Sequence, residues 1–323
     1  MRISKLFEFF PLLEIAVKNL YWRVKPFHRY LNKIKKKKKR PVSSNSIDTS
    51  LNFDKIIDVL IGFGVCEGDI LIINSSMKAL RATGLNEKEI IIRLKLLVGD
   101  SGTLAMPSIP IIKNEPSGLE MLDETKYSDT LEYNVRKSVP WTGSLPRILA
   151  RFDGAIRSRH PFNTITAYGP HAGEMMQENL KYELSTPCGR GSSWEYCYKN
   201  GAKIIAIGVD LAHSLTMIHL AEDLFESAWP IKTWYRNRSF KIIDGTHEAF
   251  VKVRQRRHTW SIFFAERSFS RDLYNNDIAK HDCIDGLDVS YCESEKLIAY
   301  LNSKKSHAYP YKIPFMNILS KYL

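Results

Sequence analysis

Residues 202–222 read AKIIAIGVDLAHSLTMIHLAE and contain the clearest buried strand of the chain. The run Ala202–Val209 is apolar and rich in isoleucine, and its length suits a strand that is covered on both faces. A helix is expected to begin near Ser214 and to carry Thr216, His219 and Glu222. A strand that feeds a helix is the repeating unit of α/β folds, in which ligands gather outside the carboxyl ends of the strands.

The same alternation continues on both sides of this unit. Apolar periodicity predicts helices at 53–64, 86–98, 143–152, 170–180, 192–200 and 294–303, and strands at 69–75, 102–106 and 163–168. From Trp234 to Phe264 the period becomes two, with Gly245 at a hairpin, which predicts an antiparallel meander. The segment Pro107–Pro140 has no clear period, and its length marks it as a candidate substrate loop.

The net charge of +12 is concentrated at the start of the chain. Residues 1–40 hold thirteen Lys or Arg against Glu8 and Glu14, so the rest is nearly neutral and no nucleic-acid partner is expected. This extension mixes apolar and basic residues, which suits peripheral contact with an anionic membrane; a solvated tail or an extra helix on the body fits equally well. Residues 41–50 are polar and aperiodic, so we divide the chain into the extension 1–40, the linker 41–50 and one domain, 51–323.

The five cysteines are odd in number and widely spaced, with no C-x-x-C pair or metal-ligand rhythm, so no metal is expected. A reducing compartment fits this pattern best. The first twenty residues contain charged side chains and Pro11 instead of the unbroken apolar run of a signal peptide or membrane span. We therefore expect a cytoplasmic protein, with attachment to the inner face of the membrane as an open addition.

His219 is followed by Glu222 three residues later and by Asp223 four residues later on the expected helix. Either carboxylate can hold one imidazole nitrogen and leave the other nitrogen as a base. The spacing alone is weak evidence, because a histidine beside an acid on a helix is more often an ordinary surface or core pair.

Two further segments carry polar residues next to expected strands. Residues 154–170 read GAIRSRHPFNTITAYGP, and their positive charge suits the phosphates of an anionic cofactor, although a plain basic loop explains it as well. Residues 68–80 read GDILIINSSMKAL, and Ser75 and Ser76 follow the strand, where they can donate to a cofactor or cap the next helix.

In this order and spacing, the three segments resemble the aminoglycoside 3-N-acetyltransferase family over about residues 53–230. The matching motifs are the His-Ser-Ser-Leu type segment (Asn74–Met77), G-T-L-x-x-P (Gly102–Pro107), G-A-x-R-S-x-H-P (Gly154–Pro161), A-x-G-P (Ala167–Pro170) and T-x-x-H-L-A-E (Thr216–Glu222). The resemblance implies an α/β fold with a mixed central sheet flanked by helices, to which the sequence adds a C-terminal antiparallel meander and the basic N-terminal extension.

The resemblance also implies an acetyl-CoA-dependent N-acetyltransferase that acylates an amine of an amino sugar or aminoglycoside by direct transfer, with 51–323 as the acetyltransferase domain. His219 would be the general base, and Glu222 would orient it. The residues expected near coenzyme A are Ser75, Ser76, Arg157, Ser158 and His160, and those expected near the acceptor are Asp210, Thr216 and Asp223. A homodimer is left open.

The sequence departs from the family at positions that bear on the acceptor. Asn74 stands where the family usually has histidine, and the family's acidic stretch beyond the last motif has no clear counterpart. Instead Lys252–His258 reads KVRQRRH, which would suit an anionic amino sugar of surface-polysaccharide assembly, unless these side chains point to solvent. A binding or scaffold protein that kept the fold and lost catalysis is the alternative of another class.

Overall fold

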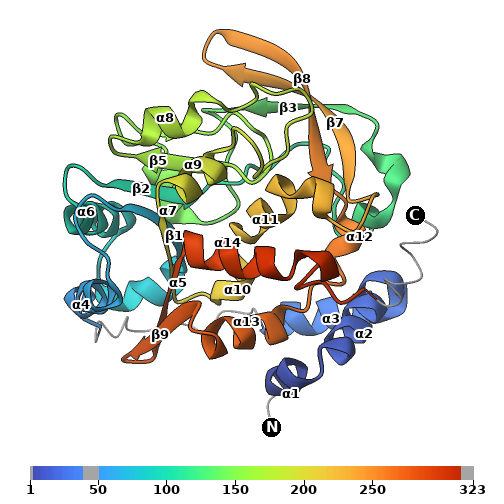
Figure 1. Cartoon of the computed structure of the whole chain (residues 1–323), viewed down its shortest axis with the longest axis horizontal. Coiled ribbons are helices and arrows are strands. Elements are labelled where there is room, and N and C mark those ends of the chain that lie inside the picture. Colours follow the sequence, from blue (N-terminus) through green and yellow to red (C-terminus); the bar gives the residue numbers. More distant parts are fainter. Residues whose placement is uncertain (1–2, 39–50, 314–323) are drawn as a thin grey trace.

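The structure is a computed structural model that describes residues 3–38 and 51–313 (Figure 1). The linker expected at 41–50 lies outside the described residues. Most of the chain folds around a seven-stranded sheet, and a three-stranded sheet lies at one end of the molecule, at the top of Figure 1.

The seven-stranded sheet is mixed and has the order β4-β5-β2-β1-β6-β10-β9. Its strands are β1 (Ile70–Ser75), β2 (Thr103–Pro107), β4 (Ile156–Arg157), β5 (Ile165–Tyr168), β6 (Lys203–Ile207), β9 (Ala279–Ile284) and β10 (Leu287–Glu293). β1 lies parallel to β2 and to β6, whereas the other neighbours pair antiparallel. The expected α/β fold with a mixed central sheet is therefore confirmed.

The central strands are covered on both faces, because alternate residues belong to two hydrophobic clusters. In β1, Ile70 and Ile72 face one cluster, and Leu71 and Ile73 face the other. The first cluster is completed by α8 (Ala172–Gln177), α9 (Ser193–Lys199), α10 (Leu211–Ser214), α11 (Ile218–Leu224), α13 (Glu266–Asn275) and α14 (Ser294–Ser303). The second is completed by α4 (Phe53–Phe63), α5 (Met77–Leu80), α6 (Glu87–Val98) and α7 (Ser144–Leu149).

The three-stranded sheet contains β3 (Thr130–Asn134), β7 (Tyr235–Asp244) and β8 (His247–Arg256). β7 and β8 form the hairpin expected at Gly245, but the predicted meander is wrong beyond it. After β8 the chain forms the short helix α12 (His258–Ser261), and the third strand is β3, which pairs parallel to β7. The five residues of β3 lie within the aperiodic segment Pro107–Pro140, where so short a strand leaves little apolar pattern.

The elements between α12 and α14 were not predicted from the sequence. They are α13 and the hairpin β9–β10, and the four inner residues of β9 are exposed, so this edge strand lacks an apolar repeat. Short 3-10 turns connect other elements: η1 (Arg81–Thr83), η2 (Gly118–Leu122), η3 (Glu124–Tyr127), η4 (Glu226–Ala228) and η5 (Lys305–His307).

The N-terminal extension forms α1 (Ile3–Phe9), α2 (Pro11–Arg23) and α3 (Lys25–Lys38), which lie beside α13 at the lower right of Figure 1. The buried Glu14 accepts a hydrogen bond from the backbone N–H of Arg267 at 3.1 Å, and Lys18 Nζ donates to the carbonyl of Phe264 at 2.7 Å. Over the ranges 3–38 and 51–313, no helix is both long enough and apolar enough to cross a bilayer.

Candidate active site

A cavity of about 290 Å³ opens at the carboxyl ends of the parallel strands β1, β2 and β6. We call it the strand-end pocket. It is lined by Ile73, Asn74, Ser75, Pro107, Ile109, Trp141, Thr142, Pro146, Val209, His213, Ser214 and Thr216. The position is the one that the sequence predicted for a ligand, because open α/β sheets bind ligands where their parallel strands end.

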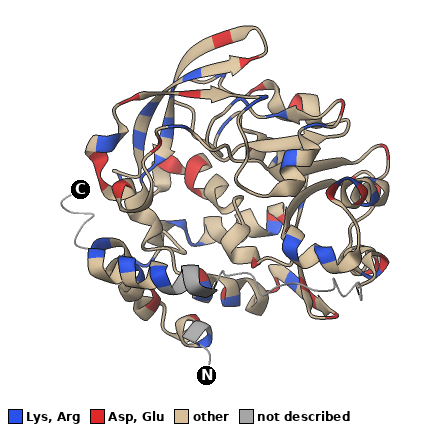
Figure 2. Cartoon of the chain, turned by 180° about the vertical axis from the view of Figure 1, so that it is seen from behind, with Lys and Arg blue, Asp and Glu red and all other residues tan. Residues whose placement is uncertain are grey.

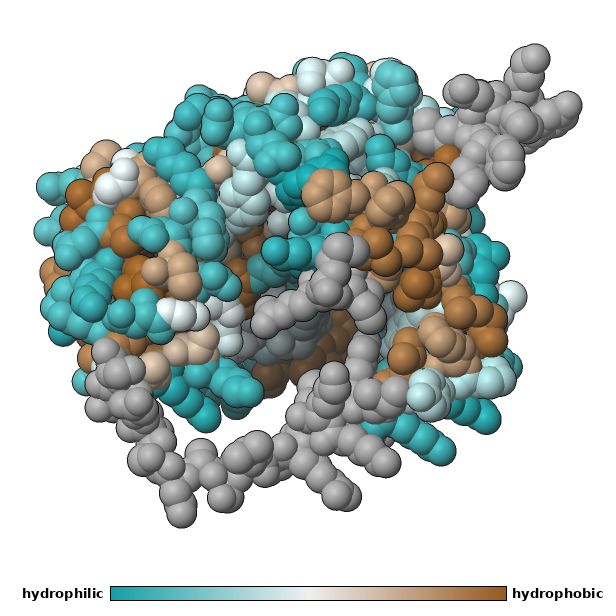
Figure 3. All heavy atoms as spheres, turned by 90° about the horizontal axis from the view of Figure 1, so that it is seen from below, coloured by the Kyte–Doolittle hydropathy of each residue, from teal (hydrophilic) through white to brown (hydrophobic). Residues whose placement is uncertain are grey.

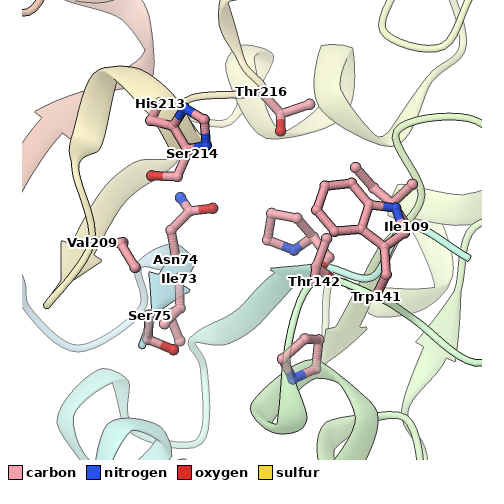
Figure 4. A pocket seen from close by; sticks show the side chains of 12 residues that line it. Ile73, Asn74, Ser75, Ile109, Trp141, Thr142, Val209, His213, Ser214 and Thr216 are labelled. Atoms are coloured by element: carbon pink, nitrogen blue, oxygen red, sulfur yellow. The ribbon is translucent and has the colours of Figure 1, made fainter. Parts of the chain in front are cut away.

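The strand-end pocket has a polar wall and an aromatic wall (Figure 4). Asn74, Ser75 and Ser214 lie on one side, and Trp141 and Ile109 lie opposite them. Ile109 belongs to the segment Pro107–Pro140, and Trp141 directly follows it. Part of the candidate substrate loop therefore borders a cavity. The two walls suit a long ligand that has both apolar and hydrogen-bonding parts.

His213 brings a titratable imidazole to the edge of this pocket. Its Nδ1 lies 3.1 Å from Oε2 of Glu266, a residue of α13. The hydrogen bond to Glu266 raises the pKa of His213 above its ordinary value and outweighs the opposing effect of partial burial. An anionic group of a ligand would therefore find a protonated imidazole here more readily than at an isolated histidine.

The chain turns directly from this pocket to His219. The single helix expected from Ser214 onward is wrong: α10 ends at Ser214, and α11 begins at Ile218. Thr216 lies in the break, and its carbonyl accepts the backbone N–H of His219 at 3.1 Å. Residues that border the strand-end pocket and the proposed base are thus joined by one turn of chain.

His219 is held by Glu222 and not by Asp223. The His219 Nδ1 atom lies 3.0 Å from Oε1 of Glu222, and the two side chains are 17% and 4% exposed. Asp223 instead accepts the backbone N–H of Cys188 at 2.8 Å and the hydroxyl of Tyr235. Of the two carboxylates that the sequence left open, the structure pairs Glu222 with the imidazole.

Glu222 is fixed by several donors. The hydroxyl of Tyr311 donates to Oε1 at 2.6 Å, and the indole of Trp234 donates to Oε2 at 3.3 Å. Burial alone would raise the pKa of Glu222, but the interaction with His219 and the cation of Arg256 outweigh burial and hold that pKa below its ordinary value. Glu222 is therefore an ionised and oriented carboxylate at neutral pH.

The proton on the imidazole is best assigned to Nδ1. Arg256 Nη1 also lies 3.2 Å from Nδ1, but a guanidinium only donates and a carboxylate only accepts, so Nδ1 can satisfy one of them. We assign the bond to Glu222, because this contact is the shorter of the two and supplies a donor to the buried carboxylate, while Arg256 donates to the hydroxyl of Tyr311 instead. No residue in the described part of the chain hydrogen-bonds to Nε2, which then carries the free lone pair.

The surroundings keep His219 neutral at physiological pH. Burial lowers the pKa of His219 first, the cation of Arg256 lowers it further, and Glu222 opposes both without reversing the direction. A neutral imidazole with a free Nε2 is a competent proton acceptor.

A second cavity of about 150 Å³ lies in front of this pair, and we call it the dyad pocket. It is lined by Phe162, Asn163, Pro187, His219, Glu222, Asp223, Gln255 and Arg256. Burial raises the pKa of Asp223 to about 7, although the hydrogen bond from Tyr235 opposes this shift. The pocket therefore offers a base, two carboxyl groups and one guanidinium to a polar ligand.

A model of the aminoglycoside 3-N-acetyltransferase family matches residues 72–304. The chain belongs to the aminoglycoside 3-N-acetyltransferase family. Among its relatives, aminoglycoside N(3)-acetyltransferase III of Salmonella sp is 27% identical over 195 residues, which are 55% of this chain and 62% of that protein. Aminoglycoside N(3)-acetyltransferase IX of Micromonospora chalcea is 29% identical over 173 residues, which are 51% of this chain and 59% of that protein. The matches thus span about three fifths of the length of these curated relatives.

A solved structure supports the same fold. AAC-IIIb in its binary structure with CoASH is similar with a TM-score of 0.64 and 17% sequence identity, over 82% of this chain and 99% of that chain. A likeness at 17% identity shows that the fold is shared. The site of this aminoglycoside 3-N-acetyltransferase family member is therefore described from its own residues.

The residues predicted from the family motifs fall into two groups. Ser75 and Thr216 line the strand-end pocket, and Asp223 lines the dyad pocket. Ser76 and Asp210 border neither pocket and instead cap helices: Ser76 Oγ accepts the backbone N–H of Ala79, and Asp210 accepts that of His213. Asp210 also pairs with Arg267 at 2.5 Å, which leaves it little freedom to meet an acceptor.

The structure places Arg157, Ser158 and His160, which the sequence predicted near coenzyme A, outside the lining of both pockets. All three side chains are buried. The Arg157 guanidinium donates to the carbonyls of Val135, Ser138 and Ser108. The His160 ring lies within 3.1 Å of the Phe162 carbonyl and 3.3 Å of the Ser185 carbonyl, and burial lowers its pKa to about 4. In this structure the side chains of Arg157 and His160 thus connect neighbouring backbone segments, and their contact with coenzyme A stays a prediction.

Other residues of the site gave no clear signal in the sequence. Trp234 follows Glu222 by 12 residues and Tyr311 by 89, and nothing in the sequence around either marks it as a partner of Glu222. His213 could have been found, because it stands three residues after Asp210 inside the motif segment 208–222. Within the described ranges, no cluster of three His, Cys, Asp or Glu side chains is arranged to hold a metal ion.

Proposed function

We propose that this chain is an acetyl-CoA-dependent N-acetyltransferase that acylates an amine of an amino sugar. The observation that carries the proposal is the neutral imidazole of His219, oriented by a buried carboxylate and one turn of chain away from the strand-end pocket. Membership of the aminoglycoside 3-N-acetyltransferase family supports the same reaction class. A binding or scaffold protein that had lost catalysis would not need this oriented base.

The strand-end pocket is the proposed site of the donor. Its polar and aromatic walls suit a pantetheine arm, Ser75 and Thr216 can hydrogen-bond to that arm, and His213 can meet an anionic group of the coenzyme. AAC-IIIb, which has the same fold, is known with CoASH. We propose that the acetyl group reaches the dyad pocket past Thr216.

The dyad pocket is the proposed site of the acceptor amine. Its two carboxyl groups suit an amino sugar that carries ammonium groups. The sequence of the basic segment Lys252–His258 suggested an anionic acceptor. Of the Lys and Arg residues in this segment, Arg256 alone lines the dyad pocket, so the support for an anionic acceptor is weak. Arg254 donates to the Leu184 carbonyl and pairs with Glu226, and Arg257 donates to the Tyr235 carbonyl. We therefore favour an aminoglycoside-type acceptor.

The proposed chemistry is direct transfer. The acceptor nitrogen attacks the thioester carbonyl carbon, a C–N bond forms, and Nε2 of His219 takes the proton that the nitrogen gives up. When the C–S bond breaks, the thiolate leaves with the bonding electron pair and receives that proton from the imidazolium. General base catalysis of this kind contributes about 10²- to 10⁴-fold. Glu222 stabilises the imidazolium, because its charge is held beside Nδ1.

The deciding experiment is a substrate panel. Purified protein is incubated with acetyl-CoA and, in parallel, with aminoglycosides and with nucleotide-linked amino sugars; released thiol and the mass of each product are measured. We expect an acetylated aminoglycoside amine. Acetylation of the nucleotide sugars alone would overturn the acceptor assignment, and the absence of transfer to any amine would overturn the enzyme assignment.

The compartment and the oligomeric state are also proposals. All five cysteines are free thiols, and Cys66 and Cys283 are exposed, which supports a reducing, cytoplasmic setting. The homodimer stays a prediction, to be measured by light scattering of the purified chain.

A further inference from the structure

The outer face of α1 and α2 carries large apolar side chains in contact with solvent. Exposed residues of this face are Phe9, Phe10, Leu12, Leu13 and Leu20, of which Phe9 and Leu12 are 66% and 65% exposed. Hydrophobic residues gather on the underside of the molecule in the part where these helices lie (Figure 3). We call these five residues the apolar face. A cluster of this kind is unusual on a monomer without a partner.

The opposite side of the same helices is anchored, so the apolar face has a fixed direction. Glu14 and Ile15 are buried against the body, and Lys18 bonds to the Phe264 carbonyl. The guanidinium of Arg271 donates to the Glu8 carbonyl at 2.6 Å and lies 5.6 Å from the Phe9 ring. These contacts hold the extension on α13, and none of the five residues of the apolar face lines either pocket.

The three helices of the extension also carry exposed cations. Exposed basic residues of the extension are Lys5, Arg23, Lys25, Arg29 and Lys33. Of its two acids, Glu14 is buried and paired with Lys18 at 2.7 Å, and Glu8 is half-buried. The sequence of helix α3 contains no acidic residue, and blue bands mark basic residues on the coloured part of this helix in Figure 2.

We propose that this face binds the surface of an anionic lipid bilayer, with the apolar side chains in the headgroup region and the cations against lipid phosphates. A bilayer satisfies both halves of the pattern, and each cation near an anionic surface raises affinity about fivefold. A second copy of this chain would bring two sets of cations together. A nucleic acid would meet the cations but leave the apolar face in water.

The test uses the full chain, two double substitutions in the extension and one single substitution elsewhere as a control. Sedimentation is measured with vesicles of phosphatidylcholine alone and of phosphatidylcholine with phosphatidylglycerol in equal parts. We expect binding to the mixed vesicles only, weakened by salt and at least tenfold weaker for Leu12→Ser/Leu20→Ser. Phe250→Ser, which removes a 76% exposed side chain from β8, is the control and should bind as the unmodified chain does. Lys25→Gln/Arg29→Gln should weaken binding to the mixed vesicles as well.

Three outcomes would overturn the proposal. One is equal sedimentation with neutral and anionic vesicles, or with neither. Another is unchanged vesicle binding by Leu12→Ser/Leu20→Ser with an unchanged melting temperature. The third is a dimer by light scattering that the same substitutions dissociate, because the apolar face would then be an interface between copies. Acetyl transfer is measured on every variant and should not change, so the result is independent of the proposed chemistry.

Discussion

The imidazole of His219 is the residue on which the proposed reaction depends. Replacing it with glutamine removes the basic Nε2 and keeps a side chain of similar reach, so kcat should fall by about 10²- to 10⁴-fold. Coenzyme A binding should be unchanged by calorimetry, since His219 does not line the strand-end pocket. Retention of normal turnover by His219→Gln would remove this residue from the mechanism.

Two neighbours of His219 should shift its pKa in opposite directions. The pKa of His219 lies below its ordinary value, so the acidic limb of the kcat/KM profile is expected below about pH 6.5. Glu222 raises this pKa and Arg256 lowers it; Glu222→Gln should therefore shift the limb to lower pH, and Arg256→Gln should shift it to higher pH. Kinetics of the two variants over the same pH range measure the sign, and shifts in one common direction would contradict the assignment.

His160 should make stability depend on pH, without acting in catalysis. Its folded pKa of about 4 lies below the ordinary 6.5, so the unfolded chain binds the proton first as the pH falls. Its stabilising contribution is complete above pH 6.5 and is lost toward pH 4, by about 3 kcal/mol. The free energy of unfolding, measured with urea over this pH range, should fall more for the unmodified chain than for His160→Gln. If it fell equally with pH for both chains, the buried neutral state of His160 would be contradicted.

At the scale of secondary structure, the close approach of β2 and β5 depends on Gly169. A Cβ at this position would lie 2.5 Å from the backbone oxygen of Gly102, and the φ of +135° is strained for other residues. Gly169→Ala should cost about 2 kcal/mol or more in unfolding free energy. Gly173→Ala in α8, where nothing lies within 4 Å of the added methyl, is the control and should be neutral or stabilising. Equal melting temperatures would refute the close approach.

The elements that the sequence predicted are those with a strong local signal. β1 and β6 are continuous apolar runs, and α6 begins at a capping box formed by Asn86 and Glu89, so both kinds of element are specified by neighbouring residues. The break between α10 and α11 could not be read in this way, because Leu215 and Met217 are buried and fit a continuous helix equally well. Its position is fixed by tertiary packing, which local periodicity does not report.

At the scale of the molecule, the two halves of the site differed in how far they could be predicted. The strand-end pocket follows from topology, because parallel strands bring distant segments to one edge of the sheet. The environment of Glu222 does not, since Trp234, Arg256 and Tyr311 reach it from three separate parts of the chain. The motif located the base, and the surroundings that set its pKa became visible only in the folded structure.

The N-terminal extension should contribute stability without contributing to transfer. Among the described side chains of the extension, residues 5–33, none lines either pocket. Ile15 is buried, Lys18 bonds to the Phe264 carbonyl, and the centroid of the Trp22 ring lies 4.8 Å from that of His258. Removing residues 1–40 should therefore lower the melting temperature measurably and leave kcat within about twofold at 25 °C. The contrary outcome is a large loss of kcat at a temperature where circular dichroism shows that the truncated chain is folded. It would mean that the Trp22–His258 contact holds Arg256, two residues before His258, in place beside His219.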